Sequence, residues 1–286
     1  MIKLIASDMD GTLLNKKHTI CEENLKAIKF AQEKGIDFTI STGRDYSLVK
    51  PILEEFKIEC QCIVMNGAEY RDEKGEVIES ISIKKENVIK VIEVFNEFEL
   101  YIEMLTSDGR YVINKKVFEN SNLDRKEMFC ENMTQEEVDE FDKHFDFVFK
   151  VKYVDDINEF INSNIEVYKI MTFNKDSKII EKSKEKLKSE ELLSVAATFS
   201  NDIEITNVEA QKGLILAKVT EKMGLSRDEV MVLGDSFNDY SMFTEFKNSF
   251  AMENAIDEIK EIATYITDSN DNSGVAKAIY KMIENN

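Results

Sequence analysis

Two aspartates close to the N-terminus have the spacing that most suggests chemistry. Asp8 and Asp10 stand one residue apart, directly after a short apolar run, and a Gly-Thr pair follows them. Two carboxylates at the end of a buried strand repel each other unless a cation or a proton lies between them. Oxygen ligands of this kind are typical of Mg²⁺ sites. On its own, an Asp-x-Asp pair is equally compatible with a solvated turn.

Three further residues could complete a phosphoryl-transfer site with this pair. Asp8 is a candidate nucleophile of the aspartyl-phosphate kind, and Asp10 is close enough to act as acid and base at the same centre. Thr42 can hydrogen-bond a phosphoryl oxygen, and Lys212 can neutralise the charge that spreads over those oxygens during transfer. Asp235 is a second acidic residue after an apolar run, able to complete the Mg²⁺ site with Asp8.

Composition narrows the function classes. The chain has 286 residues, 43% of them hydrophobic, and a net charge of −19, which argues against nucleic acid and anionic membranes as partners. An anionic small substrate then requires a local cation. Only two histidines, His18 and His144, are present, and neither has a convincing partner for a Ser-His-Asp, Cys-His or His-ligated zinc site. The N-terminus lacks a signal-peptide pattern and no apolar stretch approaches ~20 residues, so we expect a cytoplasmic protein.

Short apolar strands alternate with helices in the first and last regions, which predicts a doubly wound parallel sheet of α/β class. Polar or small residues follow these strands, namely Asp8 and Asp10, Thr42 and Gly43, Asn66 and Gly67, and Asp235, Asn238 and Asp239. Ligands of such sheets bind outside the carboxyl ends of the strands, so we expect these residues to converge. No Gly-x-Gly-x-x-Gly follows the first strand, which disfavours a dinucleotide site.

A hairpin is expected at 69–83, with its turn at Gly75. The middle of the chain then has a different texture, with a hairpin expected at 101–114 that turns at Gly109, and no acidic cluster. We therefore predict core segments at 1–82 and 208–286 around an inserted α+β domain at 83–207. Locally, Thr19-Ile20-Cys21-Glu22 suggests a capping box, and Pro51 predicts an interruption of the helix around it. Residues 120–134 are polar and weakly periodic, a helix is expected from about Gln135, and a strand near 147–151.

The motifs together resemble the haloacid dehalogenase superfamily, in its Cof-type branch of cap-bearing sugar-phosphate phosphatases. Order and spacing agree along nearly the whole chain, and the insert lies where that branch carries its α/β cap. The matching stretches are 8–14 (DMDGTLL), 41–44 (STGR), 66–68 (NGA), 212–213 (KG), 234–239 (GDSFND), 251–255 (AMENA) and 274–276 (GVA). The implied fold is a Rossmann-like core with an inserted cap.

The resemblance implies roles that agree with those above. Asp8 would attack phosphorus, and Asp10 would protonate the leaving oxygen and then deprotonate water. Mg²⁺ would bind the carboxylates of Asp8 and Asp235 and the backbone carbonyl of Asp10. The implied phosphate-binding residues are Thr42, Gly43, Arg44, Asn66, Lys212 and Asn238, with Asp239 supporting the metal ligands or Lys212.

Some of these residues have simpler interpretations. Arg44 could be a surface residue or contact the cap, Asn66 could only close a turn, and Asp239 could cap the helix that follows. The leading hypothesis is a Mg²⁺-dependent phosphatase of small phosphorylated metabolites, with sugar phosphates as the default substrate. The alternatives are a phosphomutase or phosphotransferase of the same superfamily, and a phospho-Asp binding module without turnover.

Overall fold

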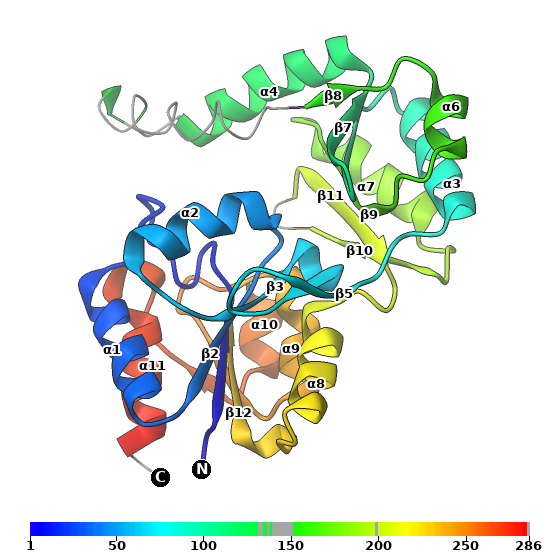
Figure 1. Cartoon of the computed structure of the whole chain (residues 1–286). Coiled ribbons are helices and arrows are strands. Elements are labelled where there is room, and N and C mark those ends of the chain that lie inside the picture. The colour runs from blue at the N-terminus through cyan, green and yellow to red at the C-terminus, as the bar shows by residue number, and fades with distance from the viewer. Residues whose placement is uncertain (131–133, 136–137, 139–150, 198–199, 285–286) are drawn as a thin grey trace. The chain divides into compact units, whose positions relative to one another are not determined.

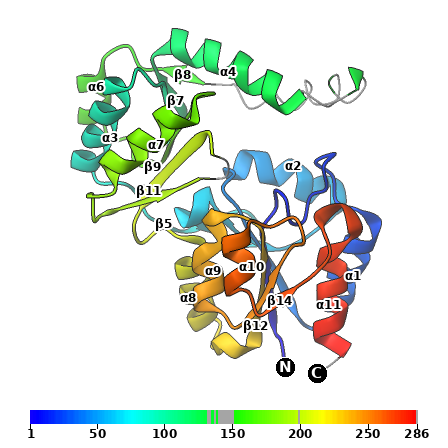
Figure 2. The same cartoon turned by 180° about the vertical axis from the view of Figure 1, so that it is seen from behind.

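The computed structural model describes residues 1–130, 134–135, 138, 151–197 and 200–284. The chain forms two compact units (Figures 1 and 2): unit 1 comprises Met1–Ile81 and Glu209–Asn286, and unit 2 comprises Ser82–Val208. Each unit has its own sheet. The strand expected near 147–151 and most of the helix expected from Gln135 lie outside the described residues.

Unit 1 is built on an eight-stranded sheet in the order β14-β13-β12-β1-β2-β3-β4-β5. The pairs from β14 to β3 are parallel, and β4 and β5 continue the sheet as an antiparallel hairpin. The predicted doubly wound parallel sheet is therefore confirmed, with an antiparallel extension. The strands are β1 (Leu4–Ser7), β2 (Asp37–Ser41), β3 (Gln61–Val64), β4 (Glu69–Arg71), β5 (Val77–Ser80), β12 (Val230–Gly234), β13 (Asn248–Ala251) and β14 (Tyr265–Ile266).

Helices cover both faces of this sheet. One face packs against α1 and α11, and the opposite face against α8, α9 and α10 (Figures 1 and 2). Because both faces are covered, the central strands β1 and β12 are buried along their whole length. The helices are α1 (Glu22–Glu33), α2 (Tyr46–Phe56), α8 (Lys212–Lys222), α9 (Tyr240–Glu245), α10 (Asp257–Ile262) and α11 (Gly274–Glu284).

Two local predictions for unit 1 were wrong. The capping box at Thr19 does not form, because α1 begins three residues later with Cys21 at its N-cap and no side-chain cap. Pro51 does not interrupt its helix, since α2 runs from Tyr46 to Phe56 with the proline inside. The carbonyl that loses its partner to Pro51 is that of Ser47, an exposed residue in the first turn, where water can replace the missing hydrogen bond.

Unit 2 is an α+β domain with a six-stranded sheet in the order β10-β11-β9-β6-β7-β8, antiparallel except for the β7–β8 pair. The predicted hairpin at residues 101–114 is present, and Gly109 adopts φ +100 at its turn. The strands are β6 (Ile102–Thr106), β7 (Gly109–Ile113), β8 (Lys152–Tyr153), β9 (Val167–Phe173), β10 (Leu193–Ala196) and β11 (Asp202–Asn207).

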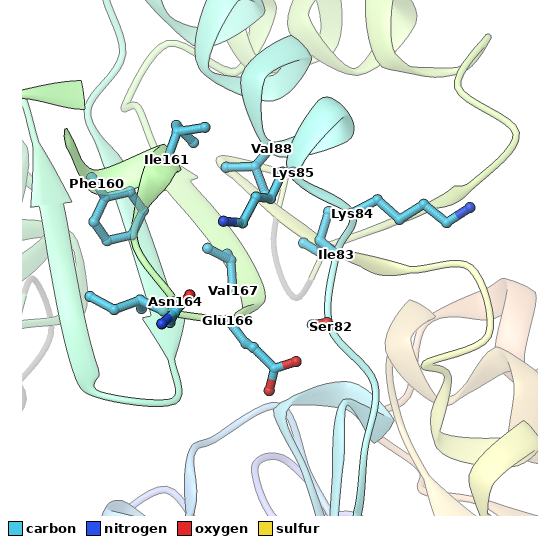
Figure 3. Close-up of a pocket in the computed structure, with 11 residues that line it drawn as sticks. Ser82, Ile83, Lys84, Lys85, Val88, Phe160, Ile161, Asn164, Glu166 and Val167 are labelled. Atoms are coloured by element: carbon cyan, nitrogen blue, oxygen red, sulfur yellow. The ribbon is translucent and has the colours of Figure 1, made fainter. Parts of the chain in front are cut away.

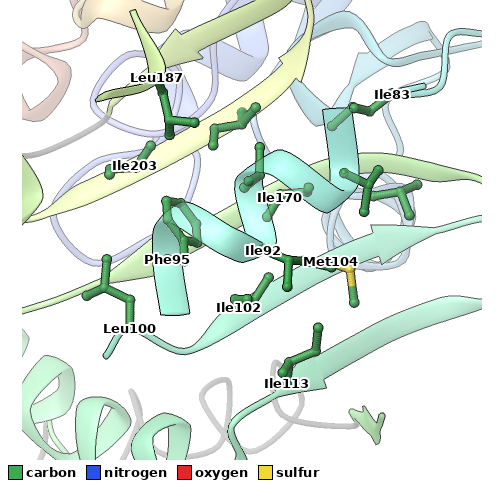
Figure 4. Close-up of a cluster of buried hydrophobic side chains, with 14 of the residues drawn as sticks. Ile83, Ile92, Phe95, Leu100, Ile102, Met104, Ile113, Ile170, Leu187 and Ile203 are labelled. Carbon is green, nitrogen blue, oxygen red and sulfur yellow. The ribbon is translucent and has the colours of Figure 1, made fainter. Parts of the chain in front are cut away.

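One hydrophobic cluster joins this sheet to its helices. Phe95 and Ile92 of α3 pack over Ile102, Ile170 and Ile203 of three strands (Figure 4). The helices of unit 2 are α3 (Lys85–Glu97), α4 (Lys115–Cys130), α6 (Ile157–Asn162) and α7 (Ser177–Leu187). Helix α4 includes much of the stretch for which no element was predicted, because its apolar residues do not form a regular helical stripe. Among the described residues, no helix is long and apolar enough to cross a membrane.

Candidate active site

Parallel pairing of β1 with β12 brings the two acidic strand ends together. The register matches Ser7 to Leu233, and the backbone N–H of Asp8 donates to the Leu233 carbonyl at 3.0 Å, so the ladder continues through the aspartate. As a result, carboxylate oxygens of Asp8, Asp235 and Asp239 lie within 4.8 Å of one another. The convergence expected from the strand ends is therefore present at the centre of the sheet of unit 1.

Lys212 is the cation at the centre of this cluster. It opens α8, and its Nζ donates to Oδ1 of Asp8 and to Oδ1 of Asp239, both at 2.6 Å. All three side chains are buried. Burial alone would lower the pKa of Lys212, but the carboxylates of Asp239 and Asp8 raise it well above its usual value. The side chain is therefore an ammonium shared between two acids.

The remaining negative charge is not balanced by Lys212. Burial raises the pKa of Asp8 well above its ordinary value, and the neighbouring carboxylates of Asp239, Asp235 and Asp10 add to this against the opposing effect of Lys212. Burial and the charge of Asp239 raise the pKa of Asp235 to about 7. Buried carboxylates that repel one another this strongly favour a bound cation, and an all-oxygen donor set suits Mg²⁺. The residues present thus fit the metal that the sequence implies.

Asp239 uses both of its oxygens inside the protein. Oδ1 accepts from Lys212, and Oδ2 accepts from the backbone N–H groups of Asp235 at 2.9 Å and Ser236 at 3.1 Å. Gly234 makes room for this carboxylate, since a Cβ there would stand 2.6 Å from its atoms. The geometry therefore favours a role for Asp239 in holding Lys212 and the loop after β12.

Asp10 has its own cation in this structure. The Nε and Nη2 of Arg44 donate to its two carboxylate oxygens at 2.7 and 2.6 Å, a bidentate pair. Burial would raise the pKa of Asp10, but the guanidinium lowers it below the usual value. The Asp10 side chain is 37% exposed, so it is more open to solvent than Asp8, and His18 Nδ1 lies 3.9 Å from its Oδ1. The sequence did not predict that Arg44 would bind Asp10.

The predicted phosphate-binding residues after β2 and β3 are also close to one another. The buried Thr42 accepts the N–H of Arg44 at its Oγ1 (3.2 Å) and the N–H of Asn66 at its carbonyl (3.0 Å), with Gly43 between Thr42 and Arg44 in the chain. Asn66 adopts φ +59, and its Oδ1 accepts from Nδ2 of Asn238 at 3.3 Å. The amide pair links the loop after β3 to the loop after β12.

Thr12 contacts the acidic cluster, which the sequence did not predict. Its Oγ1 donates to Oδ1 of Asp235 at 2.9 Å, across 223 residues of sequence. The preceding Gly11 has φ +78, and a Cβ there would lie 2.3 Å from Oδ2 of Asp235. The Gly-Thr turn therefore both makes space for Asp235 and orients it. The only local signal was a hydroxyl directly after the glycine of the turn.

A pocket in unit 2 contains none of the predicted site residues. It has a volume of about 290 Å³, with Ile83, Val88 and Val167 among its apolar residues and Lys85 and Glu166 among its charged ones (Figure 3). Lys85 Nζ donates to the carbonyl of Ser163, and Glu166 accepts from the hydroxyl of Tyr168. The side chains of Lys85 and Glu166 thus have partners within the unit.

Comparison with known proteins gives consistent matches along the chain. A family model described as haloacid dehalogenase-like hydrolase matches residues 5–279. The 5-amino-6-(5-phospho-D-ribitylamino)uracil phosphatase YwtE of Bacillus subtilis is 31% identical and covers 99% of this chain and 98% of its own. The phosphatase YcsE of B. subtilis, which has the same activity in its name, is 34% identical, with 97% and 94% covered. A solved haloacid dehalogenase-like hydrolase from B. subtilis has a TM-score of 0.84 at 27% identity, with 97% and 99% covered.

Proposed function

The chain belongs to the haloacid dehalogenase-like hydrolase family, and from this we propose that it is a Mg²⁺-dependent phosphatase of small phosphorylated metabolites, acting through an aspartyl-phosphate on Asp8. Sugar phosphates and related polyol phosphates are the substrate class we favour. The names of two relatives, which include a phosphorylated ribityl group, support this choice.

The observation that carries the proposal is the environment of the Asp8 carboxylate. One of its oxygens is held by Lys212 at 2.6 Å, and the side chain lies in the cluster with Asp235 and Asp239. A carboxylate can attack phosphorus when the charge of the phosphoryl oxygens is neutralised nearby. Lys212 supplies one positive charge at that point, and the surplus of carboxylates supports a bound Mg²⁺ as the second.

The proposed reaction has two steps. An oxygen of Asp8 attacks phosphorus, the bond from phosphorus to the leaving oxygen breaks, and Asp10 gives that oxygen its proton. Asp10 then takes a proton from water, the water oxygen attacks phosphorus, and inorganic phosphate leaves with Asp8 restored. Mg²⁺, held by the carboxylates of Asp8 and Asp235 and the carbonyl of Asp10, would supply charge neutralisation and orient the phosphoryl group.

Arg44 connects substrate binding to this proton transfer. In the structure it donates to both oxygens of Asp10 and lowers the pKa of that carboxyl, so Asp10 is held ionised and cannot protonate a leaving group. A phosphate dianion competes for the same bidentate guanidinium fork. We therefore assign to Arg44, beside Thr42, Gly43, Asn66 and Asn238, a contact with the substrate phosphate that releases Asp10.

We also assign the role of a cap to unit 2, residues 82–208. The two connections that join it to unit 1 are tied to each other, since Nδ2 of Asn207 donates to the carbonyl of Ser82 at 2.9 Å. Hydrogen exchange measured with Mg²⁺ and a phosphate analogue tests the role. Slower exchange at both connections is expected of a closing cap, whereas protection limited to the segment around Asp8 would indicate a fixed second domain.

A phosphate-release screen with Mg²⁺ over many phosphate esters tests the function directly. Asp8→Asn serves as the blank, and Asp257→Asn, an exposed aspartate of α10, is the matched control. Release of phosphate from sugar phosphates by the wild type and the control, but not by the blank, is expected. Formation of an isomeric phosphate ester would indicate a mutase instead, and a stable phosphoprotein without turnover would indicate a binding module.

A further inference from the structure

The loop after β13, residues 252–256, contacts both chain segments that carry the acidic cluster. It belongs to the 251–255 motif, for which the proposed chemistry gives no role. Three of its groups donate hydrogen bonds to backbone carbonyls: Met252 N–H to Gly234 at 3.2 Å, Ile256 N–H to Asp235 at 3.0 Å, and Asn254 Nδ2 to Gly11 at 2.8 Å. The loop thus ties the end of β12 to the turn that follows Asp8 and Asp10.

The side chain of Asn254 is itself held in place. Its Oδ1 accepts the backbone N–H of Asn270 at 3.0 Å, and Nδ2 of Asn270 donates to the carbonyl of Leu14 at 2.8 Å. Asn24 adds a third amide, which donates to Leu13 at 3.4 Å. Three asparagine side chains therefore hold three carbonyls within residues 11–14. A turn fixed at several points costs less entropy when it binds an ion.

The position of Gly11 affects two of the acids that are proposed to hold the cation, Asp10 and Asp235. The peptide before it carries the carbonyl of Asp10, and its own Cα packs directly against the carboxylate of Asp235. Thr12, the next residue, orients that carboxylate by a hydrogen bond. A shift of Gly11 would therefore change the spacing of the oxygens that are to hold the cation.

We infer that Asn254 is a positioning residue of the metal site, which fixes the Gly11 turn relative to Asp235 without touching substrate or metal. The inference rests on the proposed Mg²⁺ site. It predicts that loss of the amide weakens Mg²⁺ binding while the chain still folds, because Asn254 is exposed and its removal leaves no buried cavity.

The test compares Asn254→Ala with Asn248→Ala in the full chain. Asn248 also donates its amide to backbone carbonyls, of Asp228 and Val230, but at the opposite end of β12. Titration calorimetry measures the Mg²⁺ dissociation constant, and thermal denaturation in chelator measures the stability without metal. Asn254→Ala should bind Mg²⁺ about fivefold more weakly, because losing the hydrogen bond to Gly11 costs about 1 kcal/mol of binding free energy. Asn248→Ala should bind Mg²⁺ as the wild type does.

Turnover provides the second measurement. At saturating Mg²⁺, Asn254→Ala should approach the wild-type rate, since only the assembly of the site is impaired. An unchanged dissociation constant, or a lowered rate that saturating Mg²⁺ does not restore, would overturn the inference. Asn270→Ala, which removes the amide that holds the carbonyl of Leu14 in the same turn, should weaken Mg²⁺ binding in the same direction. If the wild type binds no Mg²⁺ yet releases phosphate in chelator, the proposed metal dependence fails and this inference fails with it.

Discussion

Both units of the molecule bury charged side chains, but they balance them differently. In unit 2, Lys169 contacts Glu204 at 2.6 Å and Arg110 contacts Glu103 at 2.9 Å, so each of these two buried acids has a cation beside it. In unit 1, the single ammonium of Lys212 serves Asp8 and Asp239, with Asp235 close beside them. Paired charges of the first kind can be purely structural, whereas a surplus of buried carboxylate indicates a site for a cation.

Asp10 is an exception among the acids of unit 1. Its carboxylate has its own cation, the guanidinium of Arg44, as the acids of unit 2 have theirs. The pair differs in exposure, because Asp10 is 37% and Arg44 22% exposed, whereas Lys169 and Glu204 are 1% and 8% exposed. Water and an anionic substrate can therefore reach the first pair, and the proposed mechanism requires that it separate.

The strongest test of the comparison is Asp8→Asn. The substitution keeps the shape of the side chain and removes the nucleophile, so turnover of every substrate should fall by at least ~10⁴-fold. Stability without metal should not fall, because the asparagine relieves repulsion among the acids. Phosphate release and thermal denaturation in chelator measure the two effects. Residual turnover near the wild-type rate would remove Asp8 from its assigned role.

Asp10→Asn should produce a loss that depends on the leaving group. Removing the proton donor typically costs ~10²–10⁴-fold, and a sugar alkoxide needs that proton far more than a nitrophenolate does. Burst kinetics with nitrophenyl phosphate should therefore show a nearly normal first step. The phosphorylated enzyme should accumulate, since the attacking water has lost its base.

Equal losses on both substrates, with no trapped phosphate on Asp8, would show that Asp10 only anchors structure or metal.

Arg44→Lys tests the contact of Arg44 with the substrate phosphate, because the lysine keeps the charge and loses the bidentate fork. If Arg44 contacts the phosphate, this variant should raise KM for every ester. An unchanged KM would restrict Arg44 to its contact with Asp10.

Asp235→Asn tests the cation site itself. Because Asp235 is proposed as a direct ligand, its removal should weaken Mg²⁺ binding by more than the ~10- to 100-fold that loss of an outer-shell partner typically costs, while Thr12 can still donate to the amide oxygen. Chelation should abolish turnover of the wild type, and added Mg²⁺ should restore it. Titration calorimetry measures the Mg²⁺ affinity, and activity measured against Mg²⁺ concentration gives the metal dependence of turnover. Full activity in chelator would contradict the cation site.

In unit 2 the corresponding substitution should act on stability instead. Glu204→Gln removes the carboxylate that lies 2.6 Å from the buried ammonium of Lys169, and breaking a buried ion pair typically costs about 3–5 kcal/mol of unfolding free energy. Replacing both residues by methionine should recover most of that loss. Denaturant titration of the three proteins measures the effect. A Glu204→Gln protein as stable as the wild type would show that the pair in unit 2 is not the structural contrast we describe.

Much of the candidate site could be predicted because its residues follow apolar strands. In a doubly wound sheet the carboxyl ends of strands meet, so Asp8, Thr42, Asn66 and Asp235 could be expected together without knowledge of any contact. The contacts themselves could not be predicted. The bond from Thr12 to Asp235 and that from Asn254 to Gly11 join residues more than two hundred positions apart, and neither leaves a periodic pattern.

The wrong predictions for the start of α1 and for the continuity of α2 have a different cause from the missed contacts. Local rules placed the hairpin turns at Gly75 and Gly109 correctly, because positive φ at a glycine is a property of the turn alone. The start of α1 and the continuity of α2 through Pro51 depend on which backbone groups the fold buries, which the local sequence does not state.

The smallest effect we predict is the pH dependence of stability in chelator. The pKa of Asp235 is about 7 in the folded protein, against 3.8 for an ordinary aspartate. Between these values the folded protein keeps a proton that the unfolded chain has lost, so raising the pH favours unfolding. Stability should therefore fall by about 1–3 kcal/mol from pH 5 to pH 8, and then level off.

Mg²⁺ should remove this slope, because a bound cation stabilises the ionised acids, and Asp235→Asn in chelator should reduce it. Denaturant unfolding at several pH values, with and without Mg²⁺, measures both. The raised pKa of Asp8 acts in the same direction, whereas the lowered pKa of Asp10 affects stability only in more acidic solution. A flat profile in chelator would mean that Lys212 alone balances the acids of unit 1, and the contrast with the paired charges of unit 2 would disappear.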